Sequence, residues 1–161
     1  MIVTKRLTIR PTRGDREALA KQVSWLNDPE TVQYSEQRHE KHTVDTQAVY
    51  VSTGGFHEIY YGNDMVGTIK VYTDRPNSVS NVGILIGKKY WGDGLGSEAW
   101  AGFCDHLLHN GTRKIEAGMM SINRGMIKVC QKTGMYEEGR LLDRFYVDEM
   151  LVDQVNYGKF R

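Results

Sequence analysis

The chain has 161 residues, a length that suits one domain with a single hydrophobic core. Its 21 basic and 20 acidic residues leave a formal net charge of +1, and the basic residues are dispersed, which argues against nucleic acid as a partner. Apolar runs are short and residues 1–10 alternate charged with apolar side chains, so we expect no membrane span, no signal peptide and a cytoplasmic protein. Cys104 and Cys130 lack the spacing of a zinc site or a disulfide framework and are predicted to be reduced thiols.

Hydrophobic periodicity predicts strands and helices along the whole chain, with no linker or repeat between them. Asp15 opens a helical pattern that Asp28-Pro29 stops, and Thr43 is a plausible N-cap for a helix that Gly54-Gly55 ends. The other predicted elements are strands 6–10, 56–61, 65–72, 79–86, 114–120, 136–142 and 150–160, and helices from about 97 to 111 and over 126–132. This order predicts a single α+β (mixed α/β) domain, 1–161, built on one sheet.

Three glycines alternate in the segment 91–96, between an apolar strand and the start of a helix. Without Cβ atoms, Gly92, Gly94 and Gly96 allow several backbone N–H groups to approach one anion, and a helix N-terminus adds partial positive charge. The segment therefore predicts a phosphate-binding loop, with an ordinary tight turn as the alternative. A nucleotide triphosphatase loop is excluded because no Lys follows the last Gly, and the glycine spacing does not fit the dinucleotide fingerprint.

The loop resembles the acetyl-CoA loop of the GCN5-related N-acetyltransferases (GNAT), whose pattern is Gln or Arg, two residues, Gly, one residue, Gly or Ala. Here Trp91 stands in the first position, and Gly94 and Gly96 fill the other two. Further matching segments are 115–117, Asn123 and 134–136, where Met135 replaces the usual Phe, and 6–11 and 25–30, which are typical of the branch that includes the ribosomal-protein alanine acetyltransferases. The resemblance covers nearly the whole chain.

This resemblance implies one mostly antiparallel central sheet of six to seven strands, about four helices, and a splayed strand before the glycine loop. It implies direct acetyl transfer from acetyl-CoA to an amine in a ternary complex, without a metal. The implied pyrophosphate-binding residues are Trp91, Gly92, Asp93, Gly94, Leu95, Gly96 and Ser97. Backbone N–H groups among Gly83, Ile84, Leu85 and Ile86 would polarise the thioester carbonyl, and a β-bulge there would free such a group. A well-packed central strand explains the same residues equally well.

Three residues in and between the following strand and helix are candidates for the chemistry. Asn123 follows a strand end and precedes a helix, so its amide is expected to cap the helix and to contact the cofactor. The resemblance places a tyrosine, the acid for the departing thiolate, at the position of Cys130. A thiol is acidic enough to replace it, but buried cysteine is more often a small core residue, and both interpretations stay open. Glu116 is a weaker candidate for a general base.

The segment 34–43 is rich in polar and ionisable residues and lies where the resembling enzymes form part of the acceptor wall. Glu36, His39 or His42 is a candidate base for the acceptor ammonium, and Arg38 is a candidate partner for an acceptor phosphate or carboxylate. A solvated loop is the alternative. His39 and His42 have no third ligand nearby in sequence, so we predict no zinc site.

The acceptor is the least determined part of this interpretation. The leading hypothesis is a small-molecule amine, such as the amino group of a nucleotide-linked aminosugar, because the segments 27–38 and 42–43 resemble acetyltransferases of surface-polysaccharide pathways. A protein N-terminus is the second hypothesis, and a non-catalytic acyl-CoA-binding module is the third. The apolar segment 151–157 is compatible with a homodimer interface or with an ordinary sheet interior.

Overall fold

A computed structural model describes residues 1–161. Its helices and strands follow the predicted order, with an additional short strand at the start and two short 3-10 helices. The elements are β1 (Ile2–Val3), β2 (Leu7–Pro11), α1 (Arg16–Leu26), η1 (Glu36–His39), α2 (Val44–Ser52), β3 (Phe56–Tyr61), β4 (Asp64–Asp74), β5 (Val79–Ile86), η2 (Lys88–Tyr90), α3 (Leu95–His109), β6 (Lys114–Met120), α4 (Arg124–Lys132), β7 (Tyr136–Val147) and β8 (Met150–Phe160). No helix is both long and apolar enough to cross a membrane.

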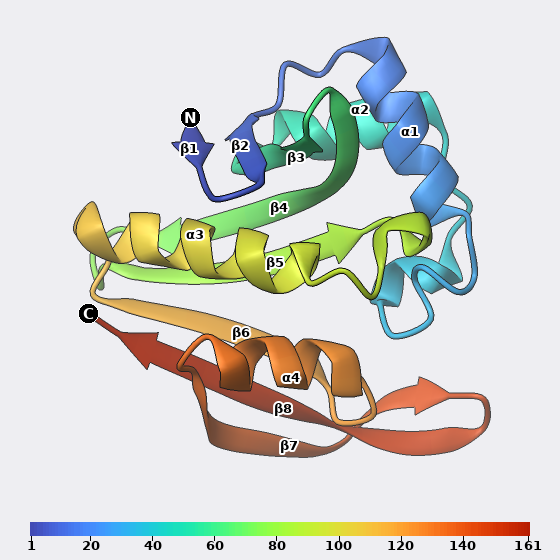
Figure 1. Cartoon of the computed structure of the whole chain (residues 1–161). Coiled ribbons are helices and arrows are strands. Elements are labelled where there is room, and N and C mark those ends of the chain that lie inside the picture. Colours follow the sequence, from blue (N-terminus) through green and yellow to red (C-terminus); the bar gives the residue numbers. More distant parts are fainter.

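The strands form one sheet in the order β1-β2-β3-β4-β5-β6-β8-β7 (Figure 1). Every neighbouring pair is antiparallel except β5 and β6, which are parallel. The prediction of a mostly antiparallel sheet with four α-helices is therefore confirmed. The sheet has eight strands rather than six to seven, because residues 2–3 form an additional short strand on the edge of β2.

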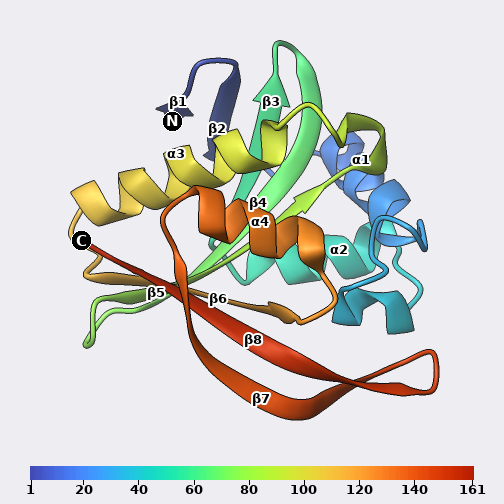
Figure 2. The ribbon, with the colours of Figure 1, turned by 60° about the horizontal axis from the view of Figure 1, so that its bottom comes forward.

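Helices cover both faces of the sheet (Figures 1 and 2). Neighbouring residues of β3 point to opposite faces, and their contacts identify the helices on each side. The His57 ring lies 4.8 Å from the ring of Phe103 on α3, whereas Phe56 packs with Leu19 of α1 and Val51 of α2. Helices α3 and α4 therefore share one face, and α1 and α2 cover the other.

Helix α3 is fixed by the main hydrophobic core. Its Trp100 and Phe103 side chains are almost fully buried against apolar strand residues such as Ile59 and Ile69. Trp100 Nε1 also donates to the sulfur of Met135 at 3.3 Å. Burial of two large aromatic side chains is a large apolar contribution to stability, and it holds the first turn of α3 in place beside the end of β5.

Strands β5 and β6 pair only at their beginnings. The parallel register joins Val79–Asn81 to residues 114–116, and beyond these residues the two strands separate. β5 stays paired with β4 along its whole length, from Val79 to Ile86, without a register shift. The predicted splayed strand is thus present, but the β-bulge expected in it is absent, since separation from β6 opens this edge instead.

Local boundaries differ from the sequence prediction for identifiable reasons. Helix α3 begins at Leu95, before the predicted start near residue 97, because Gly94 adopts the left-handed conformation (φ 76°) that permits an immediate turn into the helix. Helix α4 begins at Arg124 rather than 126 because Asn123 caps it. β7 continues to residue 147 rather than 142, through a register shift near Asp143 (φ 49°).

Candidate functional site

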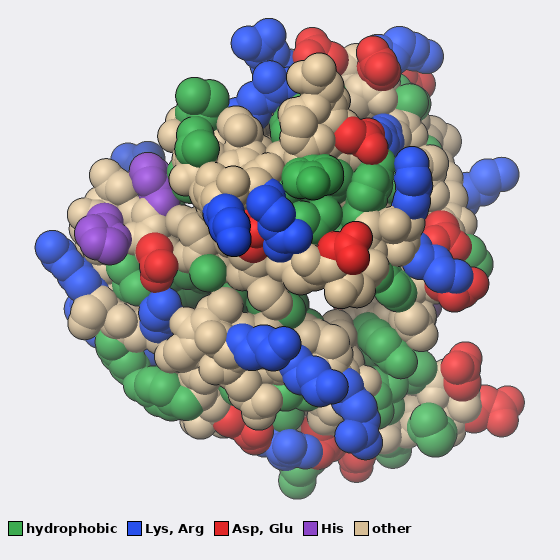
Figure 3. Space-filling model, viewed as in Figure 1, with side chains coloured by type: hydrophobic (Ala, Val, Ile, Leu, Met, Phe, Trp, Pro, Cys, Tyr) green, Lys and Arg blue, Asp and Glu red, His purple; other side chains and the backbone are tan.

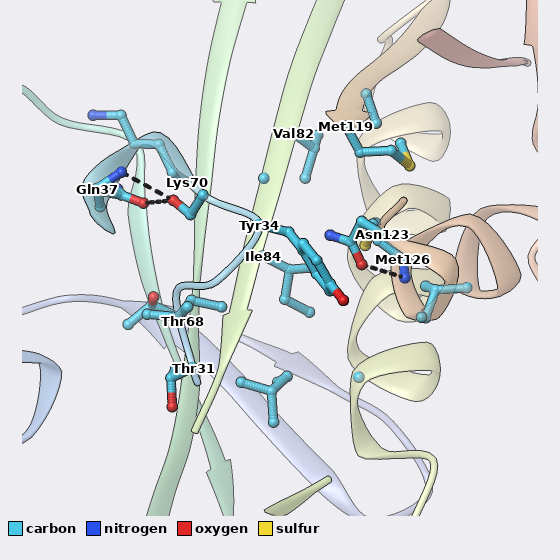
Figure 4. A pocket seen from close by; sticks show the side chains of 18 of the residues that line it. Thr31, Tyr34, Gln37, Thr68, Lys70, Val82, Ile84, Met119, Asn123 and Met126 are labelled. Carbon is cyan, nitrogen blue, oxygen red and sulfur yellow. Dashed lines mark hydrogen bonds between the residues drawn. The ribbon is translucent and has the colours of Figure 1, made fainter. Parts of the chain in front are cut away.

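A cleft of about 900 Å³ lies where β5 and β6 separate. In Figure 4, Tyr34 and Ile84 lie between two walls. One wall carries Thr68 and Lys70 of β4, and the other carries Asn123 at the start of α4. The cleft thus extends from the face covered by α3 and α4, through the gap in the sheet, to the face covered by α1 and α2.

The glycine loop lies at one end of this cleft, at the N-terminus of α3. Gly92 and Gly94 both have positive φ angles, 92° and 76°, which favour glycine. The first intrahelical bond of α3 is donated by the Glu98 N–H to the Gly94 carbonyl, so the three preceding N–H groups have no partner within the helix. Together with the positive end of the helix dipole, these groups form a site for an anion. The cleft-lining members of the predicted loop are Trp91, Gly92, Gly94, Leu95, Gly96 and Ser97.

Asp93 lies outside the cleft lining and helps to hold the loop instead. Its carbonyl accepts a bond from Arg6 Nη1 at 3.0 Å, while Arg6 Nε donates to Glu98 at 2.7 Å. Burial alone would raise the pKa of the Glu98 carboxyl, but hydrogen bonds from Thr4 and Arg6 outweigh it and hold this pKa below its ordinary value. A charged Glu98 is therefore the stable state, and it ties the loop to the residues before β2.

All four predicted β5 residues line the cleft, and their N–H groups divide into two sets. The Gly87 N–H donates to the Val66 carbonyl of β4 at 3.0 Å. Because N–H groups alternate in direction along an antiparallel pair, those of Ile84 and Ile86 point to the opposite side of β5. On that side β6 has separated from β5. Those of Gly83 and Leu85 point to β4. The indole Nε1 of Trp91 donates to the Ile86 carbonyl on the open side, at 2.8 Å. Ile84 and Ile86 thus offer unpaired donors to a carbonyl oxygen in the gap.

The position of Asn123 allows both of its predicted roles, which are capping of α4 and contact with a ligand. Its Oδ1 accepts the Met126 N–H at 3.1 Å and caps α4. With Oδ1 committed to the helix, the amide nitrogen points into the cleft (Figure 4). The side chain is thus oriented by the cap and offers its N–H₂ group to a ligand.

The structure does not bring Cys130 or Glu116 to the cleft. Cys130 is fully buried in the core, and burial raises the pKa of its thiol to about 12. This environment favours a packing role and weakens the case for a proton donor. Glu116 pairs with Lys114 at 2.8 Å and does not line the cleft.

The structure also places the candidate residues of the acceptor loop in different surroundings. Glu36 lines the cleft and is exposed, whereas Arg38 and His39 line a second, smaller cavity on the other side of the loop. Arg38 donates to the Tyr146 carbonyl at 2.8 Å and pairs with Glu36 at 3.0 Å, so its guanidinium joins the loop to β7. The ring of His42 is bonded to the Gln37 carbonyl at 2.9 Å and is a structural contact.

Sequence reasoning assigned no individual role to several cleft residues, although Tyr34 belongs to the segment 34–43 that it placed at the acceptor wall. Tyr34 lies near the centre of the cleft and its hydroxyl has no hydrogen-bond partner in the protein. Lys70 and Tyr72 line the same cleft from β4, where they share a face. Their alternation was readable in the sequence, but the gap between β5 and β6 that exposes this face depends on long-range pairing.

A row of basic residues borders the cleft on the α3–α4 face. Arg124, Lys128 and Lys132 recur every four residues along α4, are exposed and take part in no salt bridge, and a row of Lys and Arg side chains runs along α4 in Figure 3. Lys128 and Lys132 line the cleft itself. This wall suits an extended anion. No group of three His, Cys, Asp or Glu side chains is placed to hold a metal ion.

Solved structures share this fold over nearly the whole chain. An acetyltransferase of the GNAT family from Bacillus anthracis matches with a TM-score of 0.86 and 19% identity, covering 99% of this chain and 97% of that one. RimL, a ribosomal L7/L12 α-N-protein acetyltransferase in complex with coenzyme A, matches with a TM-score of 0.87 and 15% identity, covering 98% and 96%. The microcin C7 self-immunity acetyltransferase MccE, in complex with acetyl-CoA and AMP, gives 0.83 and 13%, covering 98% and 93%. No curated protein matches the chain by sequence.

The family comparison agrees with the site. A family model described as an acetyltransferase (GNAT) domain matches residues 6–136, which include the glycine loop, the splayed strand and Asn123. The resemblance predicted from the sequence is therefore confirmed. The chain belongs to the GNAT family and is an acetyl-CoA-dependent N-acetyltransferase.

Proposed function

We propose that this enzyme acetylates the primary amine of a small molecule, such as a nucleotide-linked aminosugar, by direct transfer in a ternary complex. The observation that carries the proposal is the opening of the sheet beside a helix N-terminus. Unpartnered N–H groups at the start of α3 and along β5 there face one continuous cleft.

The residues present fit acetyl-CoA, which supplies the acetyl thioester. The N–H groups of residues 95–97 would hold its pyrophosphate, and the α4 lysines would face its remaining charge. A Cβ on Gly94 would force a side chain into the left-handed region at the cradle, which explains the glycine there. The cleft therefore has both the charge and the backbone donors that this cofactor requires.

We assign the other steps of acetyl transfer to residues of this chain. The N–H groups of Ile84 and Ile86 would polarise the carbonyl, and Asn123 would position the cofactor through its amide nitrogen. Of the proposed bases, Glu36 lines the cleft and His39 does not, so we assign proton removal from the acceptor ammonium to Glu36. The thiolate leaves readily and takes its proton from solvent.

The acceptor loop is held in place at the end of the cleft. Arg38 donates to the Tyr146 carbonyl of β7 and pairs with Glu36, which lines the cleft. MccE, which shares this fold, is in complex with both acetyl-CoA and AMP, so the fold accommodates a nucleotide in addition to the cofactor. A protein N-terminus, the acceptor named for RimL, is the competing class.

The test is acetyl-CoA-dependent thiol release with nucleotide-linked aminosugars, ribosomal-protein N-terminal peptides and polyamines. Release with an aminosugar alone is the expected result, whereas release with peptides alone would overturn the acceptor assignment. Gly94→Asp should abolish thermal stabilisation by acetyl-CoA, because a carboxylate would fill the cradle. Gly111→Asp, at another left-handed glycine (φ 100°) beyond the far end of α3, is the matched control for backbone strain and should keep that stabilisation.

A further inference from the structure

Three side chains at the acceptor end of the cleft have no part in the acetyl-transfer machinery described above. Lys70 and Tyr72 alternate on β4 and share one face of the sheet, and Tyr50 approaches that face from α2. All three line the cleft. Tyr72 is 71% exposed, and Tyr50 is 43% exposed with its ring in edge contact with Phe56, so both rings are open to a ligand on part of their surface.

Lys70 carries a charge that no carboxylate balances. Its Nζ donates to Thr53 Oγ1 at 2.7 Å and to the Gly54 carbonyl, and it lies 4.5 Å from the centre of the Phe56 ring. Two of its three N–H donors are thus used and one is available. Glu36 is the only Asp or Glu side chain that lines the cleft, and it is paired with Arg38. Burial lowers the pKa of Lys70, and an anionic ligand at the remaining donor would offset that desolvation.

A second unsatisfied donor lies deeper on the same side. Gln22 is 1% exposed and lines the cleft, and its Nε2 has no hydrogen-bond partner. Its Oε1 accepts from Gln47 Nε2 at 2.8 Å, which fixes the amide. A buried donor without a partner is costly, so a ligand oxygen at this position would be favourable.

These residues lie apart from the cofactor cradle. Lys70 pairs with Gly83 of β5, three residues before Ile86, which corresponds to about 10 Å along the strand. They also occupy the face covered by α1 and α2, opposite to α3. A phosphate at residues 95–97 would therefore not reach Lys70.

We propose that Tyr50, Lys70 and Tyr72 form a subsite for the nucleotide part of the acceptor. The ammonium of Lys70 binds a phosphate oxygen, and an exposed tyrosine ring stacks on the base. Gln22 donates to an oxygen of the sugar that carries the amine. The subsite deepens the proposed function and rests on it, since it names the feature by which an aminosugar acceptor is held.

The test is calorimetric titration of UDP, dTDP and GDP into the protein already saturated with CoA, which blocks the cradle at α3. At least one nucleotide should bind to this complex. Lys70→Met should weaken that binding about tenfold or more, and Tyr72→Ala severalfold, while Lys70→Arg retains it. Lys159→Met and Tyr61→Ala remove a partly exposed lysine and an exposed tyrosine away from the cleft and should leave binding unchanged.

Thr53→Val tests whether a loss in Lys70→Met comes from the missing charge or from the missing contact with Thr53. The variant removes the hydroxyl that anchors Lys70 but keeps the ammonium. Nucleotide affinity should survive in this variant. Absence of nucleotide binding to the CoA-saturated protein would overturn the subsite, as would equal losses in Lys70→Met and Lys159→Met. If the subsite fails while thiol release with another amine persists, the acetyltransferase assignment stands. Failure of acetyl-CoA binding itself would instead remove the proposed function.

Discussion

The Nε atom of Arg6 lies 2.7 Å from Oε2 of Glu98, and this salt bridge joins the residue before β2 to the first turn of α3. The same guanidinium donates to the Asp93 carbonyl at 3.0 Å. One arginine therefore holds both sides of the glycine loop. The loop gains its orientation from a contact between residues more than ninety positions apart in the chain.

Arg6→Met should loosen the loop without removing any group that contacts the cofactor. Because the N–H donors would then have to be ordered on binding, we expect the dissociation constant for acetyl-CoA to rise about tenfold. Calorimetric titration measures this change. Arg113→Met, at an exposed arginine beyond the far end of α3, should leave the constant unchanged, and an equal effect in both variants would contradict the role assigned to Arg6.

Glu98 also predicts a pH dependence of stability. Its pKa is lowered in the folded protein, so its contribution is present above the unfolded value of about 4.3 and is lost as the pH falls through the lower folded value. We expect Glu98→Gln to reduce the free energy of unfolding by about 2 kcal/mol at pH 7 and by progressively less below about pH 4. Urea denaturation of both proteins from pH 3 to 7 measures the difference. A difference that grows on acidification would contradict the assignment.

Asn123 allows its structural and functional contributions to be separated by two substitutions. Asn123→Asp keeps the oxygen that caps α4 and loses the amide nitrogen that points into the cleft. It should fold with nearly normal stability and lose about tenfold or more in kcat/KM. Asn123→Ala should lose the same activity and about 1 kcal/mol of stability. Equal activity of Asn123→Asp and the parent enzyme would assign the residue to capping alone.

Cys130 should behave as a core residue. Cys130→Ala removes a fully buried sulfur, so we expect a loss of about 1 kcal/mol in the free energy of unfolding, with kcat within about twofold of the parent value. Steady-state kinetics at temperatures well below unfolding test this. A large loss of turnover with normal acetyl-CoA affinity would restore the thiol as the proton donor.

The basic row on α4 predicts a salt-dependent cofactor affinity. Lys128→Gln combined with Lys132→Gln should raise the KM for acetyl-CoA about three- to tenfold and reduce its dependence on ionic strength, because two charges along the cleft are removed. The comparison is made at several salt concentrations. The matched control replaces Lys5 and Lys41, two exposed lysines outside this cleft, and a similar effect there would indicate a general effect of net charge.

Much of the fold could be predicted because its signals are local. Thr43 caps α2 as predicted, within a capping box that the structure adds, and the glycine pattern at 91–96 marks the start of α3. The errors lie where distant contacts decide. The two residues of β1 form a strand only because they pair with β2, and β7 passes through its irregular turn at Asp143 because β8 remains alongside it.

The cofactor side of the site was more predictable than the acceptor side. Its N–H groups belong to the backbone of one loop, so glycine spacing reports on them. The acceptor side combines side chains from α1, α2 and β4 that no short motif links, which is why Lys70 and Gln22 were missed. Buried Cys130 could not be assigned from sequence because exposure depends on the packing of α4 against the core. The apolar residues Val152 and Val155 are buried within this chain, which accounts for them without a second copy.

The bond from Arg38 to the Tyr146 carbonyl limits how the acceptor loop can be exchanged with the loop of a relative. The acceptor of this bond is a main-chain carbonyl of the β7–β8 hairpin. The bond to residues 34–39 should therefore persist when the Tyr146 side chain is replaced, but it depends on the path of β7. A loop transplanted from a relative would lose its anchor unless the host hairpin followed the same course. In this enzyme, exchange of residues 34–39 should therefore need a matching change in β7, more than a hundred residues away.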